Sequence, residues 1–184
     1  MKTQIKKMVL LPVLIITGLA YASIKGNSFD ITTNRSIGGE TSMSNTQQAP
    51  DLKFKDENGE VVSLKSLEGK VVFINLWATW CPPCIHEMPS INKLRQTFKD
   101  NADLVFLMVD VDGDIEKSKA WMKRKKFDLP VHVPAGQIPR ELFSGSIPTT
   151  IIVDKNNNIV GRHVGGADYM AQEVVDLIKK LLKE

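Results

Sequence analysis

Two cysteines separated by two residues constrain this chain more than any other feature. Cys81 and Cys84 are its only cysteines, and they follow a nearly continuous apolar run at 71–77. A segment with apolar side chains at three- and four-residue spacings begins with them and continues to about Phe98. The sequence therefore predicts a buried strand that leads into a Cys-X-X-Cys motif at the start of a helix.

The start of a helix is a position that makes a thiol reactive. A helix N-terminus carries partial positive charge and unpaired N–H groups, which favour the thiolate over the thiol. Two sulfurs on one helical turn can close a disulfide after one of them has attacked a partner. A zinc site would need further ligands, but the sequence has no second cysteine pair and only three scattered histidines. A bridge closing so small a loop constrains the unfolded chain very little, which disfavours a purely structural disulfide. The motif favours redox chemistry without a metal or cofactor.

The N-terminal part of the chain resembles an export signal. Residues 1–22 begin with lysines, continue with an apolar stretch and end on the small-x-small pattern Ala20-Tyr21-Ala22. The apolar stretch is shorter than the roughly 20 residues that span a bilayer, which favours a cleaved signal over an uncleaved anchor. Residues 23–49 are polar and lack sustained periodicity, which predicts a flexible linker. The expected globular domain is 50–184, in the periplasm or cell envelope.

The excess of positive charge belongs to the expected signal. The whole chain has 24 Lys and Arg against 21 Asp and Glu. Three of the lysines and none of the acids lie in 1–22, so the rest of the chain has 21 of each. This balance gives no reason to expect binding to nucleic acid or to an anionic membrane.

The remaining pattern predicts alternating strands and helices of the α/β class. A turn signal at 56–59 predicts an N-terminal β-hairpin. Further along, the expected elements are strands at 71–77 and 104–109, helices at 81–98 and 115–126, a short extended piece at 129–133, a hairpin of strands 149–153 and 159–164, and a last helix capped by Asp168. This order predicts a mixed central sheet with a right-handed parallel crossover and helices on both faces.

With these elements in place, the sequence resembles the thioredoxin fold and, within it, the TlpA/ResA-like thiol–disulfide oxidoreductases of the bacterial cell envelope. The resemblance covers about residues 50–184. Its motifs are the run from 71 to Cys84, Glu87 with Met88-Pro89, Ile147-Pro148-Thr149-Thr150, Asp154, and Gly165-Gly166. It implies a mixed central β-sheet flanked by helices, with an added N-terminal β-hairpin.

The resemblance identifies Cys81 as the nucleophile and Cys84 as the resolving thiol. As the residue that caps the helix, Cys81 is expected to be the more exposed sulfur, within reach of the Cys84 amide. Pro82 suits the first helical position, where its missing N–H costs nothing. Pro83 removes a second donor, so we expect the pKa of Cys81 to be moderately depressed, not as strongly as in strong oxidants.

The resemblance also predicts a substrate-binding surface beside the disulfide. Pro148 matches the cis-proline of the fold and is expected to lie against the disulfide, with Ile147 presenting its backbone to an extended substrate. Trp80, Pro82 and Pro83 are expected to line the same surface. An apolar residue before this proline is associated with reductive thioredoxins.

Glu87 is the third expected catalytic residue. It lies three residues after Cys84 and therefore on the same helical face. Ordinary thioredoxins use a buried Asp on the first strand to accept the proton of the resolving thiol, but this chain has Asn75 there, which cannot titrate. The resemblance assigns that role to Glu87; the alternative is a solvated helix carboxylate.

The resemblance implies a reductase that receives electrons from a membrane donor. Its expected partners are oxidised envelope proteins, such as apocytochrome c, whose haem-attachment cysteines must be reduced. Two alternatives remain. A peroxiredoxin-like peroxidase would have a Pro-x-x-x-Thr-x-x-Cys pattern, which this chain lacks. A copper-handling or redox-inert binding module would need Met or His near the thiols, where only His86 and Met88 are close.

Overall fold

The computed structural model describes residues 47–184. The expected signal at 1–22 and almost all of the expected linker at 23–49 lie outside these residues. Among residues 47–184, no helix combines the length and the apolar character needed to cross a bilayer.

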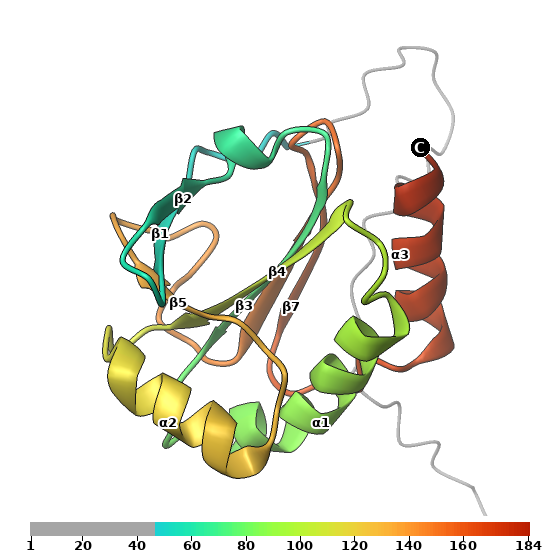
Figure 1. Ribbon diagram of the computed structural model, residues 1–184. Coiled ribbons are helices and arrows are strands. Elements are labelled where there is room, and N and C mark those ends of the chain that lie inside the picture. The colour runs from blue at the N-terminus through green and yellow to red at the C-terminus, as the bar shows by residue number, and fades with distance from the viewer. Residues whose placement is uncertain (1–46) are drawn as a thin grey trace, which may run out of the picture.

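The elements follow the predicted order, with most boundaries within about two residues of those expected (Figure 1). They are β1 (Lys53–Asp56), β2 (Val61–Ser63), the short 3-10 helix η1 (Lys65–Leu67), β3 (Val71–Trp77), α1 (Pro82–Thr97), β4 (Leu104–Asp110), α2 (Ile115–Lys125), β5 (Val131–Pro134), β6 (Thr149–Val153), β7 (Ile159–Val164) and α3 (Gln172–Lys183).

These strands form one mixed sheet in the order β2-β1-β5-β4-β3-β6-β7. Strands β3, β4 and β5 run parallel to one another. Strand β6 pairs antiparallel with both β3 and β7, and β1 pairs antiparallel with both β2 and β5. All seven residues of β3 are buried, as expected of a central strand with both faces covered. Helix α1 therefore follows a strand that is buried along its whole length.

The three α-helices pack on one face of the sheet, so the expectation of helices on both faces was wrong. Residues Val71, Phe73 and Trp77 of β3 belong to the same apolar cluster as buried side chains of α1, α2 and α3. The crossovers β3-α1-β4 and β4-α2-β5 step the same way along the sheet. Because such crossovers are right-handed, both place their helix on the same face.

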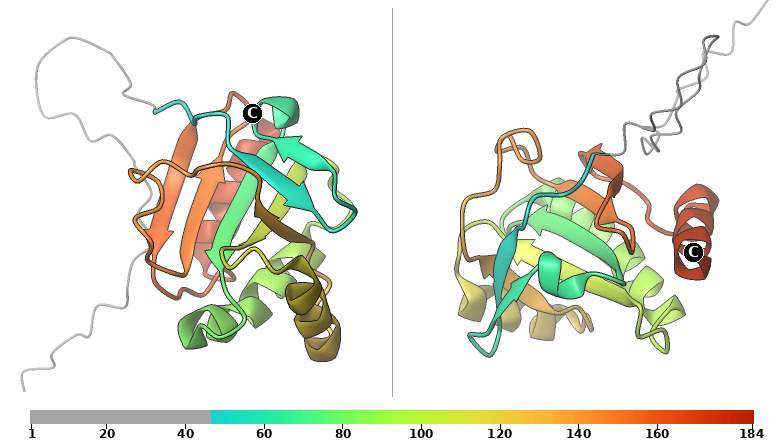
Figure 2. Two further views of the ribbon diagram at one scale, coloured as in Figure 1. Left: turned by 90° about the vertical axis from the view of Figure 1, so that its left-hand side faces the viewer. Right: turned by 90° about the horizontal axis from the view of Figure 1, so that it is seen from above.

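The other face of the sheet is covered by shorter segments. The alternate β3 residues Val72, Ile74 and Leu76 belong to a second apolar cluster, together with residues of β1 and of the loop 135–148. Figure 2 (left) looks onto this face, with α3 behind the sheet. The loop 135–148 ends at Pro148, so it joins this second core to the active-site end of β6.

Asp168 does not cap the last helix as expected. Helix α3 begins only at Gln172, with Ala171 at its N-cap and no side-chain cap. The Asp168 carboxylate instead accepts a hydrogen bond from the backbone N–H of Met170, at 2.9 Å. The backbone N–H groups of Ala167 and Tyr169 are bound by side chains of α1, which holds this stretch in a loop.

The chain enters the domain at the β6–β7 turn. Gln48 forms a β-bridge with Asn158, and the N–H of the buried Ala49 donates to the carbonyl of Asn157 at 2.8 Å. The Asn157 side-chain amide donates back to the Ala49 carbonyl at 3.1 Å. Residues 48 and 49 thus contact the domain, just before residue 50, where the domain was expected to start.

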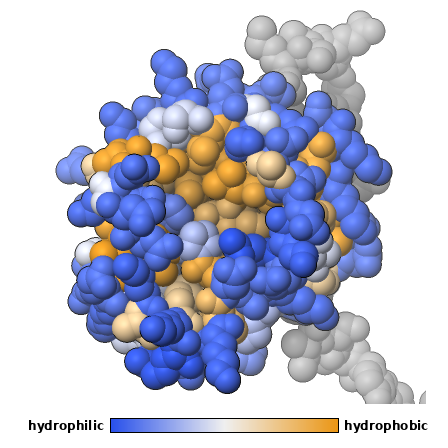
Figure 3. All heavy atoms as spheres, in the orientation of Figure 1, coloured by the Kyte–Doolittle hydropathy of each residue, from blue (hydrophilic) through white to orange (hydrophobic). Residues whose placement is uncertain are grey.

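Polar side chains make up most of the face shown in Figure 3. In the face shown in Figure 3, apolar side chains gather in a central hollow, surrounded by polar ones. Within residues 47–184, the large apolar side chains with the highest exposure are Val61, Trp80 and Val164. Trp80 is the one next to the cysteine motif.

Candidate active site

The two cysteines form a disulfide at the first turn of α1. Cys81 is the N-cap residue, with extended backbone angles, and its sulfur accepts a hydrogen bond from the Cys84 N–H at 3.3 Å. Cys81 is 2% exposed and Cys84 is fully buried. Cys81 is thus the more exposed of the two residues, as expected, but both are buried.

Two prolines limit the hydrogen bonds available to Cys81. An N-cap side chain accepts from the N–H of the second or third helical residue. Pro82 and Pro83 occupy the first two positions of α1 and have no N–H. The Cys84 N–H at the third position is therefore the one donor from this turn, which is the arrangement expected from the sequence.

Glu87 is buried on the inner face of α1, not solvated. It is 1% exposed, and its two carboxylate oxygens accept hydrogen bonds from the Asn75 side-chain amide at 2.7 Å and from the Ala167 N–H at 3.2 Å. Burial raises the pKa of Glu87 to about 8, and the two hydrogen bonds oppose this shift only in part. A carboxyl group that titrates near 8 can exchange a proton with a thiol.

The expected substrate-surface residues Pro82 and Pro83 lie in the first turn of α1 with Trp80 just before it, whereas Ile147 and Pro148 directly precede β6. The Ile147–Pro148 peptide bond is cis, as predicted. Ile147 packs, partly buried, against the apolar cluster that contains both cysteines. Trp80 is 61% exposed, and its indole N–H donates to the Asp112 carboxylate at 2.7 Å, which fixes the ring at the edge of the site.

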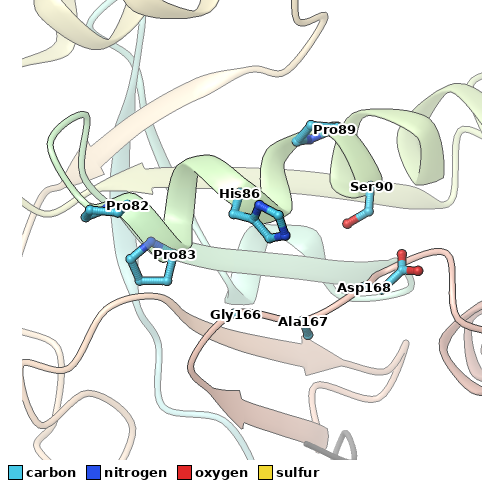
Figure 4. A pocket seen from close by; sticks show the side chains of 8 residues that line it. All are labelled: Pro82, Pro83, His86, Pro89, Ser90, Gly166, Ala167 and Asp168. Atoms are coloured by element: carbon cyan, nitrogen blue, oxygen red, sulfur yellow. The ribbon is translucent and has the colours of Figure 1, made fainter. Parts of the chain in front are cut away.

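A groove of about 810 Å³ runs along α1 beside the disulfide (Figure 4). Its wall on the α1 side includes Pro82, Pro83 and His86, and the facing wall is the loop 166–168. Sequence reasoning gave His86 no role, although its side chain lies in this groove. The Ala167 N–H that binds Glu87 belongs to the facing wall, so the groove and the buried acid share one loop.

Two further buried side chains are connected to Glu87 through hydrogen bonds by way of Asn75. Neither was expected as a site residue. Thr150 accepts a hydrogen bond from the Asn75 amide at 2.9 Å, and the Tyr169 hydroxyl is hydrogen-bonded to Thr150. Thr150 was visible in the sequence as part of a motif. Tyr169 had no signal there, because it lies in an irregular loop.

The free energy of unfolding is expected to fall as the pH rises, and replacing Glu87 with Gln is expected to remove most of this fall. The pKa of Glu87 is about 8 in the folded protein, against an ordinary value of 4.5. Between these values the unfolded chain loses this proton while the folded one keeps it, so stability falls as pH rises from about 5 to 8. The full effect is on the order of 3–5 kcal/mol, larger than the ~1 kcal/mol of one lost hydrogen bond.

Chemical denaturation of the oxidised protein at several pH values measures this effect. The free energy of unfolding should fall from pH 5 to 8 in the unmodified protein, and much less in Glu87→Gln. Glu57→Gln, which changes an exposed glutamate, is the matched control and should keep the slope. Equal slopes in all three proteins would show that the folded protein does not hold Glu87 protonated.

Comparison with known proteins gives consistent matches. The model of the AhpC/TSA family matches residues 46–162. Thiol-disulfide oxidoreductase ResA of Halalkalibacterium halodurans is 32% identical over 135 residues, 72% of this chain and 76% of that protein. Thioredoxin-like protein YneN of Bacillus subtilis is 35% identical over 127 residues, 68% of this chain and 75% of that protein.

A solved structure gives the same result for the fold. The thioredoxin-family thiol:disulfide interchange protein of Chlorobium tepidum superposes with a TM-score of 0.63 at 26% identity. The superposition covers 77% of this chain and 99% of that one. The mixed sheet and its helices therefore have the thioredoxin-like arrangement.

Proposed function

The chain belongs to the AhpC/TSA family and is a thiol–disulfide oxidoreductase, and from this premise we propose that it reduces disulfides of exported proteins in the cell envelope. The observation that carries the proposal is the Cys81–Cys84 disulfide at the helix start, beside the buried acid Glu87. Catalytic roles are proposed for these three residues. Trp80, Pro82, Pro83, Ile147 and Pro148 form the proposed substrate surface.

In the proposed reaction, the Cys81 thiolate attacks one sulfur of a substrate disulfide. A mixed disulfide forms, and the other substrate sulfur leaves as a thiolate. Cys84 then loses its proton and attacks the Cys81 sulfur, which releases the second substrate sulfur. Two electrons pass to the substrate, its two thiolates take up protons, and the enzyme is left with the disulfide seen in the structure.

Glu87 is the proposed partner for the proton of Cys84. It lies one turn further along α1, and its buried position raises its pKa to about 8, close to that of an ordinary thiol. Proton transfer between groups of similar pKa is efficient. In the oxidised protein at neutral pH, Glu87 is mostly protonated, so it is ready to return a proton to Cys84 when a donor reduces the disulfide.

Three residues support the reducing direction. Pro82 and Pro83 leave few amides to stabilise the Cys81 thiolate. Ile147, the residue before the cis-proline, has no side-chain donor to add. Strong oxidants depend on a stabilised thiolate, so a site with few donors favours reduction of partners.

The proposed partners follow from the expected export signal and from the resemblance. They are oxidised envelope proteins, with apocytochrome c as one candidate, and a membrane donor that returns the electrons. The AhpC/TSA name also raises the peroxidase alternative. In the pattern Pro-x-x-x-Thr-x-x-Cys, however, Ile74 and Ala78 stand where the Pro and Thr would precede Cys81.

A comparison of oxidants in single-turnover experiments tests the proposal. The reduced protein is mixed with a peptide that carries an intramolecular Cys-X-X-Cys-His disulfide, with glutathione disulfide or with hydrogen peroxide. We expect the peptide disulfide to oxidise the Cys81–Cys84 pair fastest, because an extended chain can use the surface at Ile147 and Trp80. Faster oxidation by peroxide would contradict the proposal and favour a peroxidase.

A further inference from the structure

A row of four buried polar side chains crosses the core behind the disulfide. The Asn75 amide nitrogen donates to Glu87 Oε1 at 2.7 Å and to Thr150 Oγ1 at 2.9 Å. The Thr150 hydroxyl is in turn hydrogen-bonded to the Tyr169 hydroxyl. None of the four side chains is more than 1% exposed. They come from β3, α1, β6 and the loop before α3, so the folded sheet is what brings them together.

Only the nitrogen of the Asn75 side-chain amide forms hydrogen bonds. Its oxygen, Oδ1, is buried and has no hydrogen-bond partner, although a buried acceptor without a partner costs free energy. An ionised carboxylate needs a donor from its neighbour, whereas a protonated carboxyl group needs an acceptor for its O–H. A side-chain amide carries both, and rotation by half a turn exchanges them.

The two hydroxyl groups can follow such a rotation. Either oxygen of the Thr150–Tyr169 hydrogen bond can be the donor. When Glu87 is ionised, Thr150 accepts from Asn75 and donates to Tyr169. When Glu87 is protonated and the amide has turned, Thr150 donates to Asn75 Oδ1 and accepts from Tyr169. The same three pairs are hydrogen-bonded in both arrangements.

We propose that Asn75 is a positioning residue for disulfide exchange, whose side-chain amide turns over each time Glu87 gains or loses a proton, and that the Thr150–Tyr169 pair reverses its hydrogen bond with it. This inference rests on the proposed role of Glu87 as the proton partner of Cys84. The rotation provides Glu87 with a matched partner in both protonation states, so the acid stays in place while the proton moves.

Other titratable groups lie around Glu87, and their titration must be distinguished from that of Glu87. Cys84 precedes it on α1, and His163 pairs with Thr150 across the β6–β7 register. Burial and the nearby Glu87 carboxylate raise the pKa of Tyr169 well above its ordinary value, so this hydroxyl keeps its proton. Outside the core, His86 and Asp168 line the groove. A Glu87→Gln variant leaves all of these groups and removes only the titration of the acid.

NMR spectroscopy of the oxidised protein from about pH 5 to 10 tests the inference, since this range brackets the Glu87 pKa of about 8. The probes are the side-chain NH₂ signals of Asn75 and the carboxyl carbon of Glu87. We expect both to shift with one common midpoint. In Glu87→Gln, the Asn75 signals should no longer follow this titration.

Tyr169→Phe tests the hydroxyl pair. This change keeps the buried ring but removes the Tyr169 hydroxyl that accepts from the Thr150 O–H. The Thr150 O–H then donates to Asn75 Oδ1 instead. This hydrogen bond holds the Asn75 amide in the arrangement that suits protonated Glu87. The Glu87 midpoint should rise by about one pH unit, the scale of one hydrogen bond. Thr149→Val is the matched control: it removes a neighbouring buried hydroxyl that donates to the Ser146 carbonyl, and it should leave the midpoint unchanged.

The outcomes separate this inference from the proposed function. If Glu87 titrates while the Asn75 signals stay fixed, the amide is a permanent donor and the inference is overturned, but the proton role of Glu87 stands. If the Glu87 titration has no counterpart in the pH profile of disulfide exchange, the proposed role of Glu87 fails, whatever Asn75 does. Should Tyr169→Phe not fold, the amide signals of the unmodified protein decide the question.

Discussion

Replacing Cys81 with Ser is expected to abolish disulfide exchange, and replacing Cys84 with Ser is expected to trap the partner. Without the Cys81 sulfur there is no nucleophile at the helix start, so the rate should fall by more than about 10³-fold. Cys84→Ser keeps the nucleophile but lacks the group that releases the substrate. It should therefore accumulate a mixed disulfide through Cys81, detectable by mass spectrometry after mixing with a disulfide peptide.

The two variants are matched controls for each other, because both lose the same disulfide and differ only in which sulfur remains. Their thermal stabilities should be similar, so a difference in reactivity reports on chemistry. Brief alkylation of the reduced unmodified protein should likewise label Cys81 before Cys84. A mixed disulfide that forms in Cys81→Ser and not in Cys84→Ser would reverse the two roles.

The reduction potential of the Cys81–Cys84 couple should lie nearer the roughly −270 mV of thioredoxin than the about −120 mV of a strong oxidant. These two values differ by a factor of about 10⁵ in the equilibrium constant, because tenfold corresponds to about 30 mV. In a glutathione buffer poised at about −200 mV, the couple should be about 200-fold in favour of the disulfide. A couple that remains mostly reduced in that buffer would contradict the reductase proposal and favour a disulfide-forming role.

Two proline variants locate the origin of this potential. Pro83→Ala restores an N–H at the second helical position, from which an N-cap sulfur can be reached. It should stabilise the Cys81 thiolate and make the couple more oxidising. Pro82→Ala restores an N–H at the first position, which does not point to the cap, and should change the potential less. An equal change in both variants would show that backbone flexibility, not the donor, sets the potential.

The sequence was most informative where a pattern is local. Strands β6 and β7 match their predicted bounds, because apolar runs flank a clear turn signal at 154–158. The N-cap position of Cys81 follows from the strand, the motif and the helical spacing around it. The cis bond before Pro148 was predicted from the resemblance, since local sequence alone favours trans.

The features that the sequence did not reveal depend on residues far apart in the chain. Asn75 drew attention only because it cannot titrate, whereas its use as a donor depends on Glu87 lying opposite it in the fold. Tyr169 comes from a loop without periodicity, and nothing in its neighbours indicates a hydroxyl in the core. Asp168 fits a local capping rule, but the backbone N–H groups on either side of it donate hydrogen bonds to side chains of α1, so the helix begins later.

The point where the chain enters the domain also determines which way the disulfide points relative to an N-terminal attachment. Gln48 and Ala49 are held at the β6–β7 turn, whereas Pro148 and the disulfide lie at the other end of β6. The five residues of β6 span about 17 Å. A domain attached to a bead or electrode through its N-terminal side would therefore present its disulfide outward, toward the solution. Attachment through a groove residue such as His86 would instead cover the site, so the choice of linkage decides whether an immobilised enzyme can work.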